Sequence, residues 1–325
     1  MKILAIQNRK GIGDMVIFLP FIEAISRKFN STVSIMVKEN SKASEFLSEN
    51  ECIDEILYLQ RDKTKNSRHN GLIGTINLIK DIKKKKFDNI FIFNSSLRFN
   101  LIAKLVGAKK VYQYPLFKKK GQHIIKAAQS FLKENLDISI ESNPQIKIKE
   151  EKIEEVKNKY NINNKNKNIN LLLGIGGSGP NKRIPAEIYI KFLNNCKKEY
   201  DLRVFLATGK NEEEQKILNQ IIEKKNNFNF VRLDDLSIKE ILPIIKCCDV
   251  AVCNDTSFSH FSAALGIQTI VLMADTSTLY GNYSPQMHPI IPDQINIDQL
   301  SLAKERIDPE KIFIVFKKIL TKLNF

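Results

Sequence analysis

The chain has 325 residues, a length that favours two domains of ordinary size over one. With 43% hydrophobic and 27% charged residues, and no apolar run long enough for a bilayer, the composition predicts a soluble globular protein without a transmembrane segment. Of the formal net charge of +15, residues 1–150 carry an excess of 12, because they hold 27 Lys and Arg against 15 Asp and Glu.

The basic first half indicates an acidic partner held by charge, such as a phosphorylated substrate or an anionic membrane face. A composition bias toward Lys, Asn and Ile is the alternative explanation. Binding to nucleic acid is the weakest option, because the basic residues lack interleaved aromatics and no known module appears. Residues 118–120 are three lysines before an amphipathic segment, 123–132, which is a candidate for contact with an anionic surface or else a solvated helix.

A cytoplasmic location is expected from the N-terminus and the cysteines. The first apolar run has only five residues before it turns polar, so it predicts a strand and no signal peptide. The five cysteines are odd in number, lie in apolar contexts and lack C-x-x-C spacing, which favours reduced thiols and shows no metal site.

The first half alternates strands and helices. Strands are expected at residues 2–6, 32–37, 54–59, 89–93 and 110–114, with helices between them. The first loop contains G-x-G without a third glycine, and no acidic residue closes the second strand, so NAD binding is disfavoured. The loop instead puts Asp14 at a helix start beside Arg9 and Lys10, where the alternative role is that of a helix-capping or first-turn acid.

A charged helix at 150–160 and an Asn- and Lys-rich linker at 161–168 predict the domain boundary, giving domains 1–165 and 166–325. The second domain repeats the α/β alternation. Its loops after strands 169–175 and 203–207 are expected to meet the loop at 254–257 at one edge of the sheet. A last helix is expected at about 309–323, and such helices commonly pack back on the N-terminal domain in two-domain folds of this type.

Residues 249–273 read as a strand, a loop, a helix and a second strand. The loop Asn254–Ser257 therefore lies at the carboxyl end of a parallel sheet, where free backbone N–H groups, the hydroxyls of Thr256 and Ser257 and the imidazole of His260 suit a diphosphate. The alternative is an ordinary capped helix with no ligand.

Three segments resemble the ADP-heptose:lipopolysaccharide heptosyltransferases, glycosyltransferase family 9. They are KILAIQNRKGIGDMVIFLPFIEAI, GSGPNKRIP and NDTSFSHFSAALG, which look like the family's G-D turn with its "LP" helix, its K-x-W-P loop and its D-T-G-x-x-H-L-x-A-A-L-G donor motif. Their order and spacing match across nearly the full chain. The resemblance implies a GT-B fold: an α/β protein of two Rossmann-like, doubly wound parallel-sheet domains facing a central cleft, with the acceptor bound by the first domain and the donor by the second.

The resemblance also implies roles for residues at matching positions. Asp14 would be the catalytic base, and Lys182 would neutralise the donor diphosphate. Near Asp14, acceptor contacts are expected from Arg9, Lys10 and Gly13. The donor would be held by Ser178, Lys182, Glu212, Leu236, Asp255, Thr256, Ser257 and His260, with Leu236 against adenine and Glu212 on the ribose. Two positions depart from the family, because Ser257 stands where glycine is usual and Ile184 where tryptophan is frequent, which puts the donor's identity in question.

The implied reaction is an inverting, metal-independent transfer of heptose from ADP-heptose to a lipopolysaccharide-core or related phosphorylated acceptor, without a cofactor. Since no D-x-D pair occurs, the leaving group's charge would be met by Lys182, the helix start at Ser257 and Arg183. The expected location is the cytoplasm, at the cytoplasmic face of the inner membrane through peripheral contact. The alternatives are a nucleotide-sugar epimerase of the same fold and a non-catalytic homologue that binds a nucleotide sugar or an anionic surface.

Overall fold

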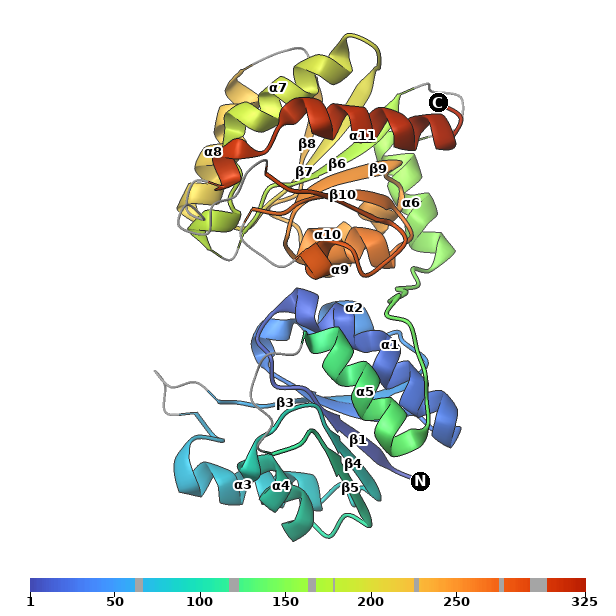
Figure 1. The fold of residues 1–325 in the computed structure, drawn as a ribbon, viewed down its shortest axis with the longest axis vertical. Helices are drawn as coiled ribbons and strands as arrows, with labels where there is room; N and C mark the ends of the chain where they lie inside the picture. Colours follow the sequence, from blue (N-terminus) through green and yellow to red (C-terminus); the bar gives the residue numbers. More distant parts are fainter. Residues whose placement is uncertain are drawn as a thin grey trace. The chain divides into compact units, whose positions relative to one another are not determined.

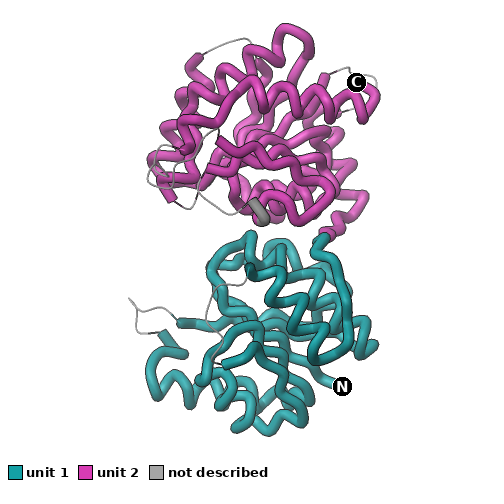
Figure 2. The backbone as a smooth tube through the Cα atoms, viewed as in Figure 1, with its two compact units in different colours: residues 1–144 teal, residues 145–325 magenta. Residues whose placement is uncertain are grey.

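The computed structural model divides into two compact units, Met1–Pro144 and Gln145–Phe325 (Figure 2). It describes residues 1–61, 67–116, 123–162, 168–177, 179–224, 228–274, 278–292 and 303–325. The boundary lies earlier than the predicted 165/166, because helix α6 (Glu150–Tyr160) belongs to the second unit. That helix buries Ile153 and Val156 and contacts α9 (Ile238–Lys246).

The first unit contains a five-stranded parallel sheet of order β3-β2-β1-β4-β5. β1 and β4 are buried along their whole length, as expected for apolar strands covered by helices on both faces. The strand order reverses between β1 and β4, and ligands of open α/β sheets bind beyond the carboxyl ends of strands at such a point. The strands are β1 (Ile3–Ile6), β2 (Val33–Val37), β3 (Ile53–Tyr58), β4 (Asn89–Ile92) and β5 (Lys110–Gln113).

Helices cover both faces of this sheet. On one face α1 contacts α5, and on the other α3 and α4 lie side by side (Figure 1). α1 begins at Ile12, two residues before the predicted start. The helices are α1 (Ile12–Phe29), α2 (Ala43–Leu47), α3 (Gly71–Lys83), α4 (Leu97–Leu105) and α5 (Ile124–Leu136), with a 3₁₀ turn η1 (Glu39–Ser41).

The apolar side of α5 is part of the core. Ile125, Phe131 and Leu132 are all buried, and Phe131 packs edge-on against Phe91 of β4. The apolar side of segment 123–132 is therefore not available to an anionic surface, because the first sheet already covers it, and contact of the segment's polar side with such a surface stays a prediction. The lysines at 118–120 lie outside the described residues.

The second unit contains a six-stranded parallel sheet of order β11-β10-β9-β6-β7-β8. Its order reverses between β6 and β9, so the ends of these two strands define the expected ligand position. β11 is a short edge strand that the sequence did not predict; it pairs with β10. The strands are β6 (Ile169–Gly174), β7 (Leu202–Ala207), β8 (Asn229–Arg232), β9 (Val250–Asn254), β10 (Gln268–Leu272) and β11 (Met287–Ile290).

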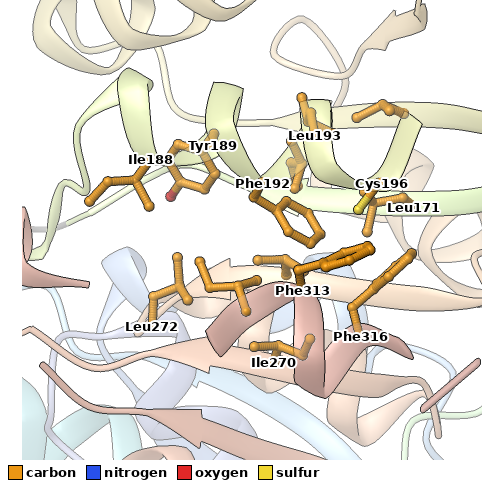
Figure 3. Close-up of a cluster of buried hydrophobic side chains, with 14 of the residues drawn as sticks. Leu171, Ile188, Tyr189, Phe192, Leu193, Cys196, Ile270, Leu272, Phe313 and Phe316 are labelled. Carbon is orange, nitrogen blue, oxygen red and sulfur yellow. The ribbon is translucent and has the colours of Figure 1, made fainter. Parts of the chain in front are cut away.

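The core of this unit lies between its sheet and the helices α7 and α11, where Phe192 and Phe316 pack edge-on with ring centroids 5.5 Å apart (Figure 3). α11 contacts α7 and strands β9, β10 and β11 of its own unit; its packing on the first domain stays a prediction. Besides α6 and α9, the helices are α7 (Ala186–Lys197), α8 (Glu212–Glu223), α10 (Ser257–Ala264) and α11 (Pro309–Lys322), with 3₁₀ turns η2 (Pro180–Lys182) and η3 (Thr278–Gly281).

Within the described ranges, no helix combines the length and apolarity needed to cross a membrane. All five cysteines lie in those ranges, and none forms a disulfide there. Burial raises the pKa of the Cys253 thiol to about 12, so this side chain behaves as a small apolar core group.

Candidate functional site

The candidate donor site begins where β6 and β9 end. Asn254, the last residue of β9, is buried, and its Nδ2 donates to the backbone oxygens of Ile175 and Gly176 at 2.8 and 3.1 Å. Its Oδ1 accepts from the hydroxyl of Tyr189, at 2.5 Å. These bonds fix the loop after β6 beside the loop after β9, as the strand pattern predicted.

Lys182 and Asp255 form an ion pair at this edge. The Nζ of Lys182, in η2, lies 2.6 Å from Oδ2 of Asp255, the residue directly after β9. The side chain of Asp255 is 5% exposed and that of Lys182 is 22% exposed. The sequence predicted both residues at one site, and the structure brings them together. Because the Lys182 side chain is partly exposed, its ammonium group can also bind a negatively charged ligand that enters from solvent.

His260 lies on the other side of the same carboxylate. Its Nε2 is 3.8 Å from Oδ1 of Asp255, and its Nδ1 is 2.8 Å from the hydroxyl oxygen of Tyr283. Burial, with the nearby Asp255 charge, raises the pKa of Tyr283 well above its usual value, so the hydroxyl stays protonated. A tautomer with its proton on Nε2 accepts from Tyr283 and turns an N–H toward Asp255, which fits both neighbours.

The N-terminus of α10 starts two residues after Asp255. Thr256 is the N-cap residue, and its backbone N–H donates to Ser259 Oγ at 3.4 Å. The hydroxyl oxygen of Thr256 is buried and has no hydrogen-bond partner among the described residues. The first N–H groups of a helix also lack intrahelical partners and carry a partial positive charge. The helix start at Ser257 therefore combines free donors with a buried hydroxyl, an arrangement that binds anions.

A buried glutamate that the sequence reasoning missed joins the loops after β6 and β7. Glu214 accepts from the backbone N–H of Gly177 at 2.9 Å, from that of Gly209 at 2.8 Å and from the hydroxyl of Thr208 at 3.3 Å. A Cβ at position 209 would lie 2.6 Å from Glu214 Oε2, so glycine is needed for this approach.

Glu212, the predicted ribose ligand, is exposed on the first turn of α8. The 3.6-residue period of α8 could have shown which of the two glutamates is buried, because Glu214 lies on the same helix face as the apolar residues Leu218 and Ile221. Leu236, the predicted adenine contact, is half-buried in the turn between β8 and α9. Ser178 lies outside the described residues.

Arg183 supports the loop after β6. Its Nε donates to the backbone oxygen of Gly177 at 3.2 Å, and its guanidinium pairs with Glu213. Only 12% of this side chain is exposed. Arg183 therefore orders the loop next to Lys182, and its charge is already opposed by a carboxylate.

The carboxyl edge of the first sheet carries Asp14. This residue is in the first turn of α1, and its carboxylate accepts from Gly11 N–H at 3.3 Å and from Arg9 Nη1 at 3.3 Å. It is a first-turn acid rather than the N-cap, which is Gly11. Lys10 and Gly13 lie close to it in the sequence; Lys10 is exposed and Gly13 is half-buried.

Further cations gather at this edge that the sequence reasoning did not single out. Lys38 and Arg61 follow β2 and β3, and Arg98 is in the first turn of α4. Burial lowers the pKa of Lys38, and the positive charges of Lys10 and Arg61 lower it further. Burial and Arg61 likewise lower the pKa of Arg98. Their positions in the sequence could have indicated this edge, since each lies just beyond a predicted strand or in the first turn of the helix that follows one.

Several buried polar atoms at the same edge have no hydrogen-bond partner among the described residues. They are Gln7 Nε2, Asn94 Nδ2, Arg98 Nη1 and Tyr114 Oη. Buried polar groups are normally satisfied, so unpaired donors beside several cations indicate a place where a polar, anionic group binds. Across the described residues, no group of three His, Cys, Asp or Glu side chains could hold a metal ion.

The profile of glycosyltransferase family 9 (heptosyltransferase) matches residues 107–306. A curated relative is the lipooligosaccharide heptosyltransferase 2 of Campylobacter jejuni serotype O:2, which is 24% identical over 249 residues, or 74% of each chain.

Two solved structures are similar in fold. The E. coli ADP-heptose lipopolysaccharide heptosyltransferase II is 16% identical, with a TM-score of 0.77 over 100% of both chains. A second E. coli heptosyltransferase, solved with ADP, is 13% identical, with a TM-score of 0.70 over 98% of this chain and 100% of the other. At these identities the likeness shows the fold, which is the predicted GT-B type.

Proposed function

The chain belongs to glycosyltransferase family 9, the heptosyltransferase family, and we propose that it transfers heptose from ADP-heptose to a lipopolysaccharide-core or lipooligosaccharide acceptor. Glycosyl transfer itself follows from the family; the sugar, nucleotide and acceptor are the proposal. The relatives named for a lipooligosaccharide and for ADP-heptose support it.

The observation that carries the proposal is the Lys182–Asp255 pair beside the N-terminus of α10. A diphosphate placed there would accept hydrogen bonds from N–H groups of the helix start, from the Thr256 hydroxyl, which has no partner among the described residues, and from the charged Lys182. Asp255 and His260 would then face the sugar. Ser257 adds a hydroxyl where the family has glycine, and we propose that it contacts the donor.

Inversion requires a single in-line displacement. The carboxylate of Asp14 would take the proton of an acceptor hydroxyl, whose oxygen attacks the anomeric carbon from the face opposite the diphosphate. The bond from that carbon to the diphosphate oxygen breaks, and ADP leaves with the electron pair. Arg9 and Gly11 orient the Asp14 carboxylate for this step.

Metal independence is part of the proposal. Charge on the departing diphosphate would be stabilised by Lys182 and the α10 dipole, so turnover should persist in excess EDTA. Loss of turnover in EDTA that Mg²⁺ restores would show that these groups do not suffice.

An anionic acceptor is favoured by the first unit. Beside their burial, the positive charge of Arg61 lowers the pKa of Lys38 and that of Arg98, and Arg98 Nη1 is buried without a hydrogen-bond partner among the described residues. A phosphate or carboxylate of the acceptor would offset this mutual repulsion. Such an acceptor is reached at the cytoplasmic face of the inner membrane, which is the location that we propose.

A nucleotide panel tests the donor. ADP, UDP, GDP and CDP would each be titrated in thermal-shift and calorimetric experiments, since a ligand that binds only the native state raises the apparent stability by mass action. We expect ADP to bind most tightly; preference for UDP or GDP would overturn the assignment of the nucleotide. Donor incubated without acceptor separates the alternatives: an epimerase isomerises it, and a non-catalytic homologue binds it unchanged even with acceptor present.

A further inference from the structure

The outer surface of α3 and α4 carries large apolar side chains that no described residue covers. Leu72 is 87% exposed and Leu97 is 60% exposed, although leucines of folded proteins are usually buried. We call the whole group the α3–α4 surface. It consists of Leu72, Ile73, Ile76, Leu97, Leu101 and Leu105, all of which are exposed.

These residues face away from the core. α3 buries Leu78 and Ile82, and α4 buries Phe99 and Ile102, in one cluster with Leu4 and other residues of the first sheet. Leu97, Leu101 and Leu105 recur every four residues and so form one stripe on the opposite side of α4. α3 and α4 are in contact on the same face of the first sheet (Figure 1). The exposed residues of both helices therefore belong to one outward layer of the first unit.

Lysines share this layer. Lys80 and Lys83 lie on the same side of α3 as Leu72 and Ile76, and Lys104 is next to Leu101 and Leu105 on α4. The three lysines are exposed and form no ion pair with any described residue. Residues 71–110 contain nine Lys and Arg against two Asp, so this part of the chain carries an excess of seven positive charges.

We propose that the α3–α4 surface docks on an anionic lipid bilayer. Apolar side chains would enter the boundary between headgroups and acyl chains, while the surrounding lysines remain at the phosphates. A second copy of this chain is the less favourable occupant, because a symmetric contact would bring two copies of the same lysine-bearing surface together. An anionic membrane removes that repulsion and replaces it with attraction.

Docking there would bring the first unit to the membrane that carries a lipid-linked acceptor, so this part of the inference rests on the proposed function. The N-termini of α3 and α4 lie at the carboxyl edge of the first sheet, as they do after any strand of a parallel sheet. Arg98 joins them, since its side chain donates to the backbone oxygen of His69 and to the hydroxyl of Thr75 at 2.8 and 2.9 Å. The membrane-facing layer and the cationic acceptor edge are thus parts of one compact unit.

The test is flotation of the full chain with vesicles of phosphatidylcholine alone or with about one-third phosphatidylglycerol, without donor or acceptor. Two variants remove the proposed contacts: Ile76→Ser with Leu101→Ser, and Lys80→Gln with Lys83→Gln and Lys104→Gln. Two matched controls alter exposed residues of the second unit. They are Ile314→Ser with Leu323→Ser, and Lys224→Gln with Lys318→Gln and Lys322→Gln.

We expect the wild type to bind the anionic vesicles only. Vesicle affinity should fall at least tenfold in each test variant and by less than about twofold in each control. Removing three lysine charges alone corresponds to a loss of affinity of roughly 100-fold at low salt. Transfer to a water-soluble, deacylated acceptor should be unchanged in all four variants, so failure of docking and failure of the enzymatic proposal are separable. Wild-type protein that stays unbound, or test variants that float like the controls, would overturn the inference. So would a wild-type dimer in sedimentation velocity that Ile76→Ser with Leu101→Ser converts to a monomer, because the surface would then bind a second copy.

Discussion

Lys182 Nζ and Asp255 Oδ2 lie 2.6 Å apart, and the carboxylate of Asp255 is almost wholly shielded from water. Lys182→Ala should therefore do two things: weaken ADP binding, and lower the free energy of unfolding by about 1–3 kcal/mol because the buried carboxylate of Asp255 loses its ion pair with Lys182. Calorimetric titration and denaturant unfolding measure the two effects.

The double variant Lys182→Ala with Asp255→Asn separates them. Since this variant no longer buries a carboxylate at position 255, it should regain most of the lost stability, whereas ADP affinity should stay low. If Lys182→Ala binds ADP as tightly as the wild type, Lys182 is a structural partner of Asp255 and the diphosphate lies elsewhere.

Asp14→Asn is expected to lower kcat by about 10²–10⁴, the usual contribution of a positioned general base. Asparagine can still accept from Gly11 N–H, so the free energy of unfolding should change by less than about 1 kcal/mol, the usual worth of a first-turn acid. Donor affinity should not change. Steady-state rates at saturating donor decide the matter, and wild-type turnover would remove Asp14 from the mechanism.

Glu214→Gln should destabilise the second unit by about 1–3 kcal/mol, because the amide NH₂ would face a backbone N–H that now donates to a carboxylate oxygen. ADP affinity should fall with it, since the loops after β6 and β7 lose their common anchor. Glu223→Gln, which changes an exposed glutamate at the C-terminal end of α8, is the control and should match the wild type in unfolding and in titration. Equal behaviour of the two variants would mean that Glu214 does not order these loops.

Acid unfolding should report the Arg68–Asp81 pair. Hydrogen bonds from Arg68, of 2.8 and 2.9 Å, lower the pKa of Asp81 to about 2. Because the folded-state pKa is below the unfolded value of about 3.9, the pair stabilises the fold above pH 4, and this contribution is lost as pH falls toward 2.

Asp81→Asn should therefore be less stable than the wild type at pH 7 by about 1 kcal/mol, a figure reduced for solvent screening because Arg68 is half-exposed. The difference should vanish near pH 2. Asp235→Asn, which removes a 90% exposed partner of Lys210, should show no difference at either pH. A constant deficit for Asp81→Asn across this range would contradict the assignment.

Much of the fold could be predicted from local pattern. The apolar runs at residues 3–6, 169–174 and 250–254 are strands buried on both faces, and their hydrophobic sequences leave little alternative. The loop that follows Asn254 was placed correctly because parallel strands put all their βα loops at one edge. The edge strand β11 was missed because Met287–Ile290 includes a proline and lacks a run of β-branched residues.

The remaining differences depend on tertiary packing. The sequence gives α5 and α3 similar amphipathic patterns, yet only packing decides that Phe131 is core while Leu72 is exposed. The choice between Glu212 and Glu214 needed the phase of α8 relative to the sheet. The ion pair of Lys182 with Asp255 joins residues 73 positions apart, and only the order of β6 and β9 in the sheet brings them together.

The most direct measurement is transfer itself. Purified protein would be incubated with ADP-heptose and a deacylated lipooligosaccharide acceptor, with ADP release followed by chromatography and the product by mass spectrometry and NMR. The account predicts that ADP appears only with acceptor present, in equal amount to a product that carries one more heptose with inverted anomeric configuration. ADP-heptose left intact by active, folded protein, while another nucleotide sugar is consumed with the same acceptor, would contradict it.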